Sequence, residues 1–200
     1  MSEQEDLAQL IRSCPRCDLC HSRAHAVPGE GPDKAEAMFI GEAPGFYEDQ
    51  QGRPFVGAAG KFLEQLLALA ELPRQDVYIT NIIKCRPPDN RDPLPKEIEA
   101  CRPWLEQQLA VIQPKVVVTL GRYSLAHFFP SEPISKIHGQ HRLRDGVYFL
   151  PMYHPAAALH QERFRRLIED DFGKLPAVLA EARKGAGREE MAEPQQMQLF

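Results

Sequence analysis

Residues 37–45 read AMFIGEAPG, an apolar run that stops at a turn carrying a single carboxylate. Such a run, closed by glycine and proline, is typical of a buried strand that enters a loop. Similar runs lie at 77–83, 115–120 and 147–153, and segments with helical periodicity follow the four runs at about 59–72, 94–112, 121–129 and 160–184. This alternation predicts an α/β fold in which a four-stranded parallel sheet lies between two layers of helices.

The composition is that of one globular domain. The chain has 200 residues, 43% of them hydrophobic and 26% charged, which is near the average for soluble proteins. We expect one domain at 1–184, beginning with a cysteine-bearing arm. A flexible tail is expected at 185–200, because glycines and polar residues follow there.

The charge pattern excludes a protein that coats nucleic acid through bulk positive charge, because the formal net charge is −4. Basic residues nevertheless outnumber acidic ones between 84 and 144, which allows a local basic cleft. The sequence shows neither a secretory signal nor an apolar run long enough to span a membrane. We therefore expect a cytoplasmic protein with no membrane partner.

Polar residues and glycines stand at the carboxyl ends of the predicted strands. Glu42 follows the first strand and Asn81 lies in the second, while Gly121 and His154 follow the third and fourth. Ligands of an open parallel sheet bind at this edge, so we expect these residues to line one site. Each has an ordinary alternative as a helix cap, a turn residue or a buried structural histidine.

The cysteines indicate a metal site. Cys14 and Cys17 are separated by two residues, and Cys85 and Cys101 follow far downstream. In a cytoplasmic protein such a set indicates metal ligation before a disulfide. Zinc and an iron–sulfur cluster both accept four thiolates, and the spacing leaves the choice between them open. Cys20 would be a fifth ligand, so we regard it as the spare.

Taken together, these stretches resemble the family 4 uracil-DNA glycosylases, the iron–sulfur branch of the uracil-DNA glycosylase superfamily. The resemblance covers about residues 14–180. It depends on the ordered set CPRC at 14–17, GEAPG at 41–45 with Glu48-Asp49, GRPFVG at 52–57, YITNIIKCRPP at 78–88 with Asn90-Arg91, Cys101, and MYHPA at 152–156.

The resemblance implies a fold, a cofactor and a reaction. The family has a four-stranded parallel sheet between helices and carries a 4Fe–4S cluster, whose ligands here would be Cys14, Cys17, Cys85 and Cys101, with zinc as second choice. The implied reaction is hydrolysis of the N-glycosidic bond of deoxyuridine flipped out of single- or double-stranded DNA, the first step of base excision repair.

The chemistry of the base explains the implied binding residues. The Asn81 amide both donates and accepts, so it would read the Watson–Crick edge of a flipped uracil. Phe55 matches the family's stacking aromatic, and Glu48 stands where bulk near C5 would exclude thymine. The expected uracil-binding set is Gly41, Glu42, Ala43, Glu48, Phe55, Asn81, Asn90 and His154.

Hydrolysis passes through an oxocarbenium-like sugar and an anionic base, so a catalytic site must stabilise opposite charges at two places. We expect His154 to donate a hydrogen bond to the developing oxyanion of uracil. Glu42 would orient or deprotonate the attacking water. Better-known relatives carry an aspartate two residues further on, where this chain has Pro44, so the role of Glu42 is inferred from its chemistry and position.

Contacts to DNA are expected from backbone amides in turns and from scattered basic residues, with one apolar side chain wedged into the vacated stack. Covalently trapping relatives carry a histidine-bearing insert between the last two cysteines, and residues 86–100 lack histidine, so ordinary turnover is expected. The expected DNA-binding set is Pro44, Gly45, Lys84, Arg86, Arg91, Lys136 and His138, with Leu159 as the wedge.

The last residues resemble the short peptide by which bacterial repair proteins bind the replication sliding clamp. Gln196, Leu199 and Phe200 would carry this contact; the alternative is an incidental amphipathic end. We expect a monomer.

Two alternative functions of the protein stay open at this point. One is a metal- or cluster-containing module that binds nucleic acid without catalysis, and the other is an electron carrier. A rim shared by Glu42, Asn81 and His154 would favour the enzyme over both.

Overall fold

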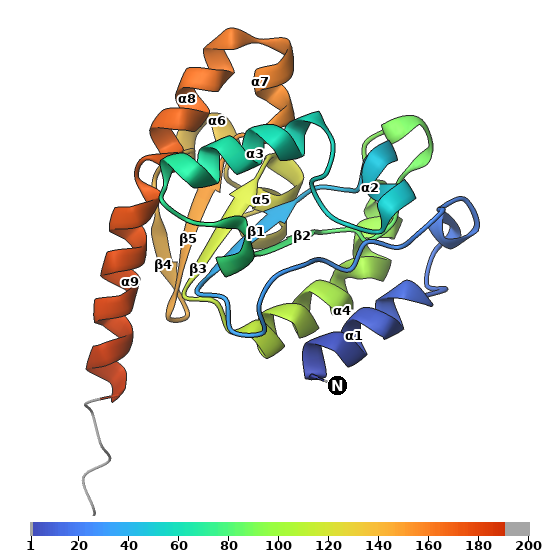
Figure 1. Cartoon of the computed structure of the whole chain (residues 1–200), viewed down its shortest axis with the longest axis horizontal. Coiled ribbons are helices and arrows are strands. Elements are labelled where there is room, and N and C mark those ends of the chain that lie inside the picture. Colours follow the sequence, from blue (N-terminus) through green and yellow to red (C-terminus); the bar gives the residue numbers. More distant parts are fainter. Residues whose placement is uncertain (1, 191–200) are drawn as a thin grey trace, which may run out of the picture.

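The computed structural model describes the backbone of residues 2–190 and the side chains of residues 2–185. A five-stranded sheet with the order β2-β1-β3-β5-β4 forms its centre, and helices cover both faces (Figure 1). All neighbouring strands are parallel except β4, which is antiparallel to β5. The strands are β1 Ala37–Gly41, β2 Tyr78–Asn81, β3 Val116–Leu120, β4 Arg142–Arg144 and β5 Val147–Met152.

The helices form two layers around this sheet, and three short 3₁₀ segments lie at Asp18–His21, Arg74–Asp76 and Pro88–Asn90. Helices α3, α8 and α9 pack on one face, whereas α1, α4 and α5 pack on the other. The helices are α1 Glu3–Arg12, α2 Phe46–Gln51, α3 Ala58–Leu69, α4 Pro95–Ile112, α5 Arg122–Phe128, α6 Ile134–Ile137, α7 Ala156–His160, α8 Glu162–Phe172 and α9 Leu175–Glu190.

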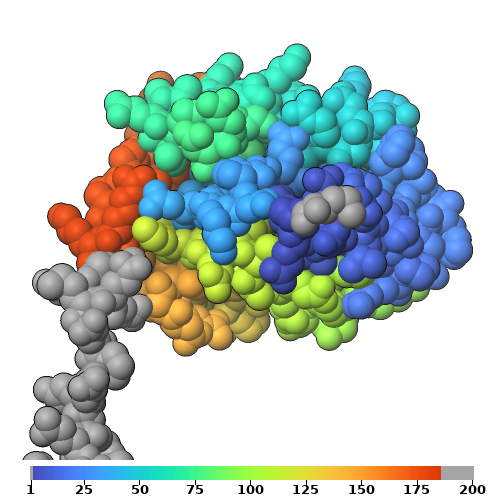
Figure 2. Space-filling model, turned by 60° about the horizontal axis from the view of Figure 1, so that its bottom comes forward, coloured from blue at the N-terminus to red at the C-terminus, as the bar shows by residue number. Residues whose placement is uncertain are grey.

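The sheet has a core on each side because its central strands are apolar on both faces. In β1, Phe39 enters the core under α3 and α8, whereas Met38 and Ile40 enter the core under α1 and α4. The N-terminal arm belongs to the second core through Ile11, which is completely buried. Figure 2 shows the dark-blue helix α1 lying against the yellow-green part of α4.

The structure confirms the α/β fold class and the four predicted parallel strands, and it adds β4. This strand has only three residues and lies at the sheet edge, so it shows no apolar period. Asp145 and Gly146 join it to β5 with φ angles of +51° and +77°. Aspartate followed by glycine is a typical signal for a two-residue hairpin turn, and it is the one signal from which this strand could have been predicted.

The expected long helix at 160–184 is divided. Extended Gln161 separates α7 from α8, and Gly173 ends α8 before α9 begins. Helix α9 then continues to Glu190, so the helix extends into residues 185–190, where the sequence predicts a tail. Ala186, Arg188, Glu189 and Glu190 are of residue types that favour a helix, and they outnumber Gly185 and Gly187, which do not. The proposed clamp residues Gln196, Leu199 and Phe200 lie outside the described residues.

Within residues 2–190, no helix is both long enough and apolar enough to cross a membrane.

Candidate active site

A cavity of about 290 Å³ opens at the carboxyl ends of the parallel strands. Its size is close to the lower end for small-molecule pockets. The loops after β1, β2 and β5 supply its walls, together with α2 and the start of α3. It is lined by Glu42, Ala43, Pro44, Gly45, Glu48, Phe55, Ala59, Asn81, Pro87, Asn90, Arg91, Asp92, Pro93, His154 and Ala156.

The structure thus brings together every residue of the expected uracil-binding set except Gly41, which lies behind the wall. A Cβ atom on Gly41 would lie 2.4 Å from Oδ1 of Asn81 and 2.7 Å from Cζ of Phe55. Any side chain at this position would therefore displace two residues that line the cavity. Gly41 shapes the site by leaving room for its neighbours.

His154 follows β5, and its ring stacks on that of Phe55 with the centroids 5.5 Å apart and an interplanar angle of 25°. Its Nδ1 accepts a hydrogen bond of 3.1 Å from the backbone N–H of Ala156. The proton of the neutral ring is therefore on Nε2. Burial lowers the pKa of His154 to about 4. Near neutral pH the side chain is an uncharged imidazole with one N–H to donate.

Glu42 lies beside His154, and Gly121 separates the two. A Cβ atom on Gly121, where φ is +96°, would lie 2.4 Å from Oε1 of Glu42 and 3.2 Å from Cβ of His154. The Glu42 carboxylate accepts a long hydrogen bond of 3.5 Å from the backbone N–H of Tyr123 in α5. Burial raises the pKa of Glu42, although the nearby charge of Arg122 opposes this shift. The carboxylate is therefore more basic than one on the surface.

Asn81 is the last residue of β2 and pairs in register with Gly41 of β1. It is buried. Its backbone carbonyl accepts a hydrogen bond of 2.6 Å from Nζ of Lys84, whereas its side-chain amide bonds to no group in the described part of the chain. Both the donor and the acceptor of this amide are therefore left for a ligand in the cavity.

Phe55 is held in a conformation that non-glycine residues rarely adopt, with φ of +51°. Arg74 holds this turn from outside: its Nη2 donates to the carbonyl of Pro54 at 2.6 Å, and its Nη1 donates to that of Phe55 at 3.2 Å. Glu30 accepts from Nε of Arg74 at 2.9 Å and from Nε of Arg53 at 2.8 Å. Nothing in the sequence signals that Arg74 and Glu30 support the aromatic ring.

Glu48 joins α2 to the start of α3. Its Oε1 accepts hydrogen bonds from the backbone N–H groups of Val56 at 2.9 Å and Gly57 at 2.8 Å. Gly57 is the N-cap residue of α3, so Glu48 holds the turn that leads into this helix from another element. The side chain forms part of the cavity wall, and its role in excluding thymine stays a prediction.

The prediction that Lys84 contacts DNA is wrong. Its side chain is only 1% exposed, because it turns inward beneath β2. Its Nζ donates to Oγ1 of Thr80 at 2.7 Å, to the carbonyl of Asn81 at 2.6 Å and to Oε1 of Gln108 at 2.6 Å. Burial lowers the pKa of Lys84 to about 8. The residue therefore supports the floor of the cavity from below.

The other expected DNA contacts are divided between the cavity and the outer surface. Pro44, Gly45 and Arg91 line the cavity, and Arg91 also forms an ion pair of 2.6 Å with the buried Glu97. Nδ1 of His138 lies 2.7 Å from Oδ2 of Asp171, outside the cavity. Arg86 donates to Asn90 at 2.7 Å, Lys136 is exposed on α6, and Leu159 is exposed on α7.

The four expected metal ligands, Cys14, Cys17, Cys85 and Cys101, line a second, narrower cavity between the N-terminal arm and α4. Cys20 is not among its lining residues. Burial raises the pKa of the Cys17 and Cys85 thiols, and it raises the pKa of Cys101 to about 11. These are the cysteines that could hold a metal group.

N–H groups point at the sulfur atoms of this cavity. Nε1 of Trp104 donates to Sγ of Cys14 at 3.1 Å, and Nη1 of Arg23 donates to Sγ of Cys85 at 3.0 Å. The backbone N–H of Lys84 donates to Sγ of Cys101 at 3.3 Å. Sequence reasoning found the cysteines but missed Arg23 and Trp104.

Comparison with known proteins agrees with this geometry. Residues 28–173 match the family described as the uracil DNA glycosylase superfamily. The chain is 46% identical over 186 residues to the type-4 uracil-DNA glycosylase of Sulfurisphaera tokodaii, covering 88% of this chain and 84% of that protein. It is 45% identical over 184 residues to the type-4 enzyme of Archaeoglobus fulgidus, covering 88% and 92%. The chain with the cavity formed by Glu42, Asn81 and His154 therefore belongs to the uracil-DNA glycosylase superfamily, in its type-4 branch.

Proposed function

We propose that this protein hydrolyses the N-glycosidic bond of deoxyuridine in DNA and so begins base excision repair. The observation that carries this proposal is the meeting of a carboxylate, a free carboxamide and a neutral imidazole in one cavity of about 290 Å³. A uracil inside a duplex is out of reach, so the nucleotide must be flipped into this cavity. Membership of the superfamily supports the same reaction.

Asn81 selects the base. Its amide N–H donates to a carbonyl oxygen of uracil, and its carbonyl accepts from the neighbouring ring N–H. Cytosine has the opposite pattern there and would leave buried groups unpaired, at a cost of about 1–3 kcal/mol each. Phe55, already stacked on His154, offers an aromatic surface beside the base. Stacking holds any pyrimidine, so the discrimination comes from the amide.

His154 stabilises the leaving base. As the glycosidic bond breaks, negative charge develops on a uracil oxygen, and Nε2–H of the neutral imidazole donates to it. The backbone N–H of Ala156 fixes this tautomer by occupying Nδ1. A preorganised donor of this kind typically contributes about 10²–10³ in rate. No reorientation is needed during the reaction, because the ring is already packed against Phe55.

Glu42 acts on the sugar and the water. Its carboxylate orients the attacking water, accepts a proton from it as the new C–O bond forms, and favours the positive charge of the sugar. The raised pKa of Glu42 makes it a stronger base than an exposed glutamate. Its position beside His154 across Gly121 lets the two side chains act on one nucleotide.

We further propose that Cys14, Cys17, Cys85 and Cys101 hold a 4Fe–4S cluster. N–H donors to thiolate sulfurs, such as those of Arg23 and Trp104, are a common feature of iron–sulfur sites. The four cysteines line one cavity and come from the arm, the loop after β2 and α4, and four thiolates are the usual ligand set of such a cluster. When bound, it supplies a structural cross-link between the arm, the loop after β2 and α4.

The test of the main proposal is a labelled oligonucleotide with one uracil, incubated without added metal and treated with alkali. The wild type should produce cleavage at uracil alone, and the His154→Ala and Asn81→Ala variants should lose it. His141→Ala is the matched control, because His141 lies next to the edge strand β4, with its Nε2 3.4 Å from Oε2 of Glu181. Binding of the oligonucleotide without an abasic product would instead favour the non-catalytic module.

Iron analysis and visible absorbance of the purified protein test the cofactor. A cluster gives iron with inorganic sulfide, whereas a zinc site gives zinc and no visible band. Action on both single- and double-stranded DNA, a monomeric state, a cytoplasmic location and clamp binding through the last residues stay predictions.

A further inference from the structure

Two aromatic side chains stand exposed next to the cavity. Phe46 is 49% exposed and Tyr47 is 60% exposed. They are the first residues of α2 and follow Gly45, which lines the cavity. Their rings meet edge to face, with centroids 5.5 Å apart. In the described part of the chain, they are the only aromatic residues among the exposed large hydrophobic side chains.

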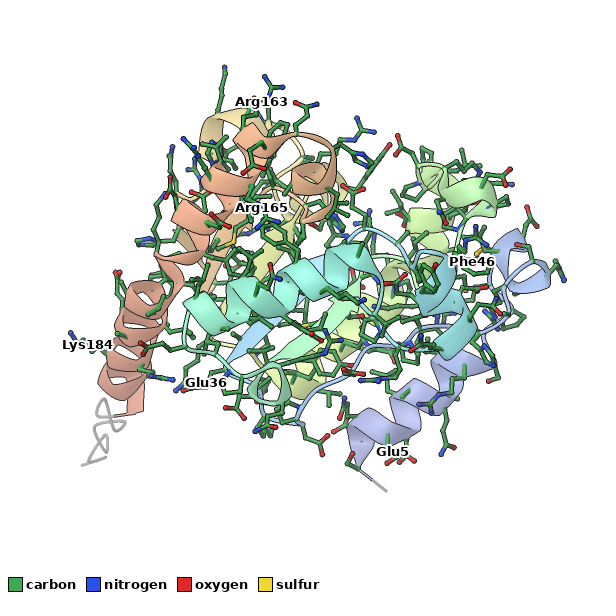
Figure 3. All side chains as sticks on the ribbon, turned by 45° about the horizontal axis from the view of Figure 1, so that its top comes forward. Glu5, Glu36, Phe46, Arg163, Arg165 and Lys184 are labelled. Carbon is green, nitrogen blue, oxygen red and sulfur yellow. The ribbon has the colours of Figure 1, made fainter. Side chains whose placement is uncertain are left out.

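Neither ring belongs to the two hydrophobic cores, and a second connection joins them to the cavity. The guanidinium of Arg86 lies over the ring of Phe46, 5.2 Å from its centroid. The same Arg86 donates to Oδ1 of Asn90, which lines the cavity. Figure 3 shows the labelled Phe46 on α2. Through Arg86, the aromatic pair and the loop after β2 form one continuous rim.

We infer that Phe46, Tyr47 and Arg86 form a second base-binding subsite, which stacks on a nucleobase adjacent to the flipped uracil on the same DNA strand. This inference rests on the proposed function. Aromatic side chains beside a guanidinium are the usual platform for single-stranded nucleic acid, because every base has a π-face. Arg86 has no carboxylate partner among the described residues, so its charge is available to a backbone phosphate.

The occupant is a nucleobase rather than an apolar protein segment because the platform is continuous with the cavity that takes the uracil. The DNA strand that carries the flipped uracil must pass over this rim or over the opposite rim, where α7 begins. In a duplex, the neighbouring base is already stacked on its own strand. The subsite should therefore contribute more to the binding of single strands than of duplexes.

The experiment measures binding of single-stranded oligonucleotides that carry one uncleavable 2′-fluoro-deoxyuridine. In one series both neighbours are normal nucleotides, and in two others the 5′ or the 3′ neighbour is an abasic spacer. The wild type should lose roughly 5- to 100-fold in affinity with one of the two spacers. The Phe46→Ala, Tyr47→Ala double variant should bind the normal strand weakly and lose no further affinity with that spacer.

Leu143→Ala is the matched control, because Leu143 is 60% exposed on the edge strand β4; it should behave as the wild type in every series. Equal affinity of the wild type for normal and spacer strands would overturn the subsite, and so would a spacer loss that persists in the double variant. These outcomes are independent of catalysis, since the probe is not cleaved. A wild-type protein that releases no uracil from the cleavable strand would instead contradict the proposed function.

Discussion

The base cavity and the cysteine cavity both border the loop that follows β2, and they are built in different ways. The polar groups of the base cavity are held by the fold itself: Ala156 fixes the ring of His154, and Val56 and Gly57 fix the carboxylate of Glu48. The cysteine cavity instead gathers thiols from three segments: the half-buried Cys14 and Cys17 of the arm, and the buried Cys85 and Cys101 of the loop after β2 and of α4. The first has its polar groups already positioned for a ligand, whereas the second brings together thiols from three separate segments of the chain.

Lys84 connects the two regions. Its Nζ supports the carbonyl of Asn81 beneath the base cavity, and its backbone N–H donates to Sγ of Cys101. The floor of one cavity is therefore part of the wall of the other. Substitutions can show how far the two regions are independent.

The largest effects are expected from one substitution in each cavity, and the two substitutions should change different properties of the protein. His154→Ala should lower the rate of uracil release by about 10²–10³ and leave iron content and the melting curve close to those of the wild type. Cys101→Ala should lower iron content, melting temperature and activity together, because one proposed cluster ligand is lost. Iron analysis, circular dichroism melting and a single-turnover assay measure these quantities. A Cys101→Ala protein with full iron content would contradict the assigned ligand set.

The next effect tests the connection between the cavities. Lys84→Met keeps the length of the side chain but leaves the acceptors on Thr80, Asn81 and Gln108 without their donor. Breaking a buried polar network of this kind costs about 3 kcal/mol, which lowers the melting temperature by roughly 6–12 °C in a protein of this size. Affinity for uracil-containing DNA and iron content should both fall.

Lys136→Met is the control for this variant, because Lys136 is exposed on α6; it should change stability by less than about 0.5 kcal/mol. If Lys84→Met melted at the wild-type temperature, the buried hydrogen bonds of Lys84 would not stabilise the fold.

A pH profile sharpens the description of the base cavity. Glu42 must be ionised to accept a proton, and burial raises its pKa above the usual 4.5. The rate should therefore fall on acidification at a higher pH than an ordinary glutamate would give. His154, with a pKa of about 4, should stay neutral through this range. Glu42→Gln should lose most of the rate together with this acidic limb.

Glu132→Gln should keep the acidic limb, since Glu132 pairs with Arg142 at the sheet edge. A limb centred near 6.5, the ordinary pKa of histidine, and retained in Glu42→Gln would show that a histidine titrates instead.

The smallest expected effect concerns the support of Phe55. Arg74→Lys keeps a positive charge near Glu30 but cannot donate at once to Pro54, Phe55 and Glu30. We expect a loss of about 1 kcal/mol in stability and a KM raised by several-fold with a smaller change in kcat, because the stacking ring becomes less well positioned. Arg53→Lys is the control, since Arg53 bonds to Glu30 and to neither carbonyl. Equal KM values in the two variants would contradict this role.

The sequence predicts the base cavity well because the carboxyl ends of parallel strands share one edge of a sheet. Glu42, Asn81 and His154 are each next to a strand end, so their convergence follows from the topology alone. The direction of Lys84 does not follow from it. A lysine beside a predicted DNA-binding loop suggests an exposed cation, and only the packing of Gln108 from α4 against β2 shows that the side chain is buried.

The residues that hold the site in place are also not indicated by any local pattern in the sequence. Arg74 lies nineteen positions beyond Phe55 and reaches it only after α3 has folded back. Strand β4 was missed for another reason, since its three residues carry no apolar period, although Asp145-Gly146 marks the hairpin.

Gly121 lies between the carboxylate of Glu42 and the Cβ atom of His154 without taking any part in the chemistry. Because this glycine has only hydrogen there, a single added methyl group would push the carboxylate away from its position and crowd the base of the histidine side chain. An inactivating lesion at this glycine would leave every reactive group intact, and a scan limited to ionisable residues would overlook it.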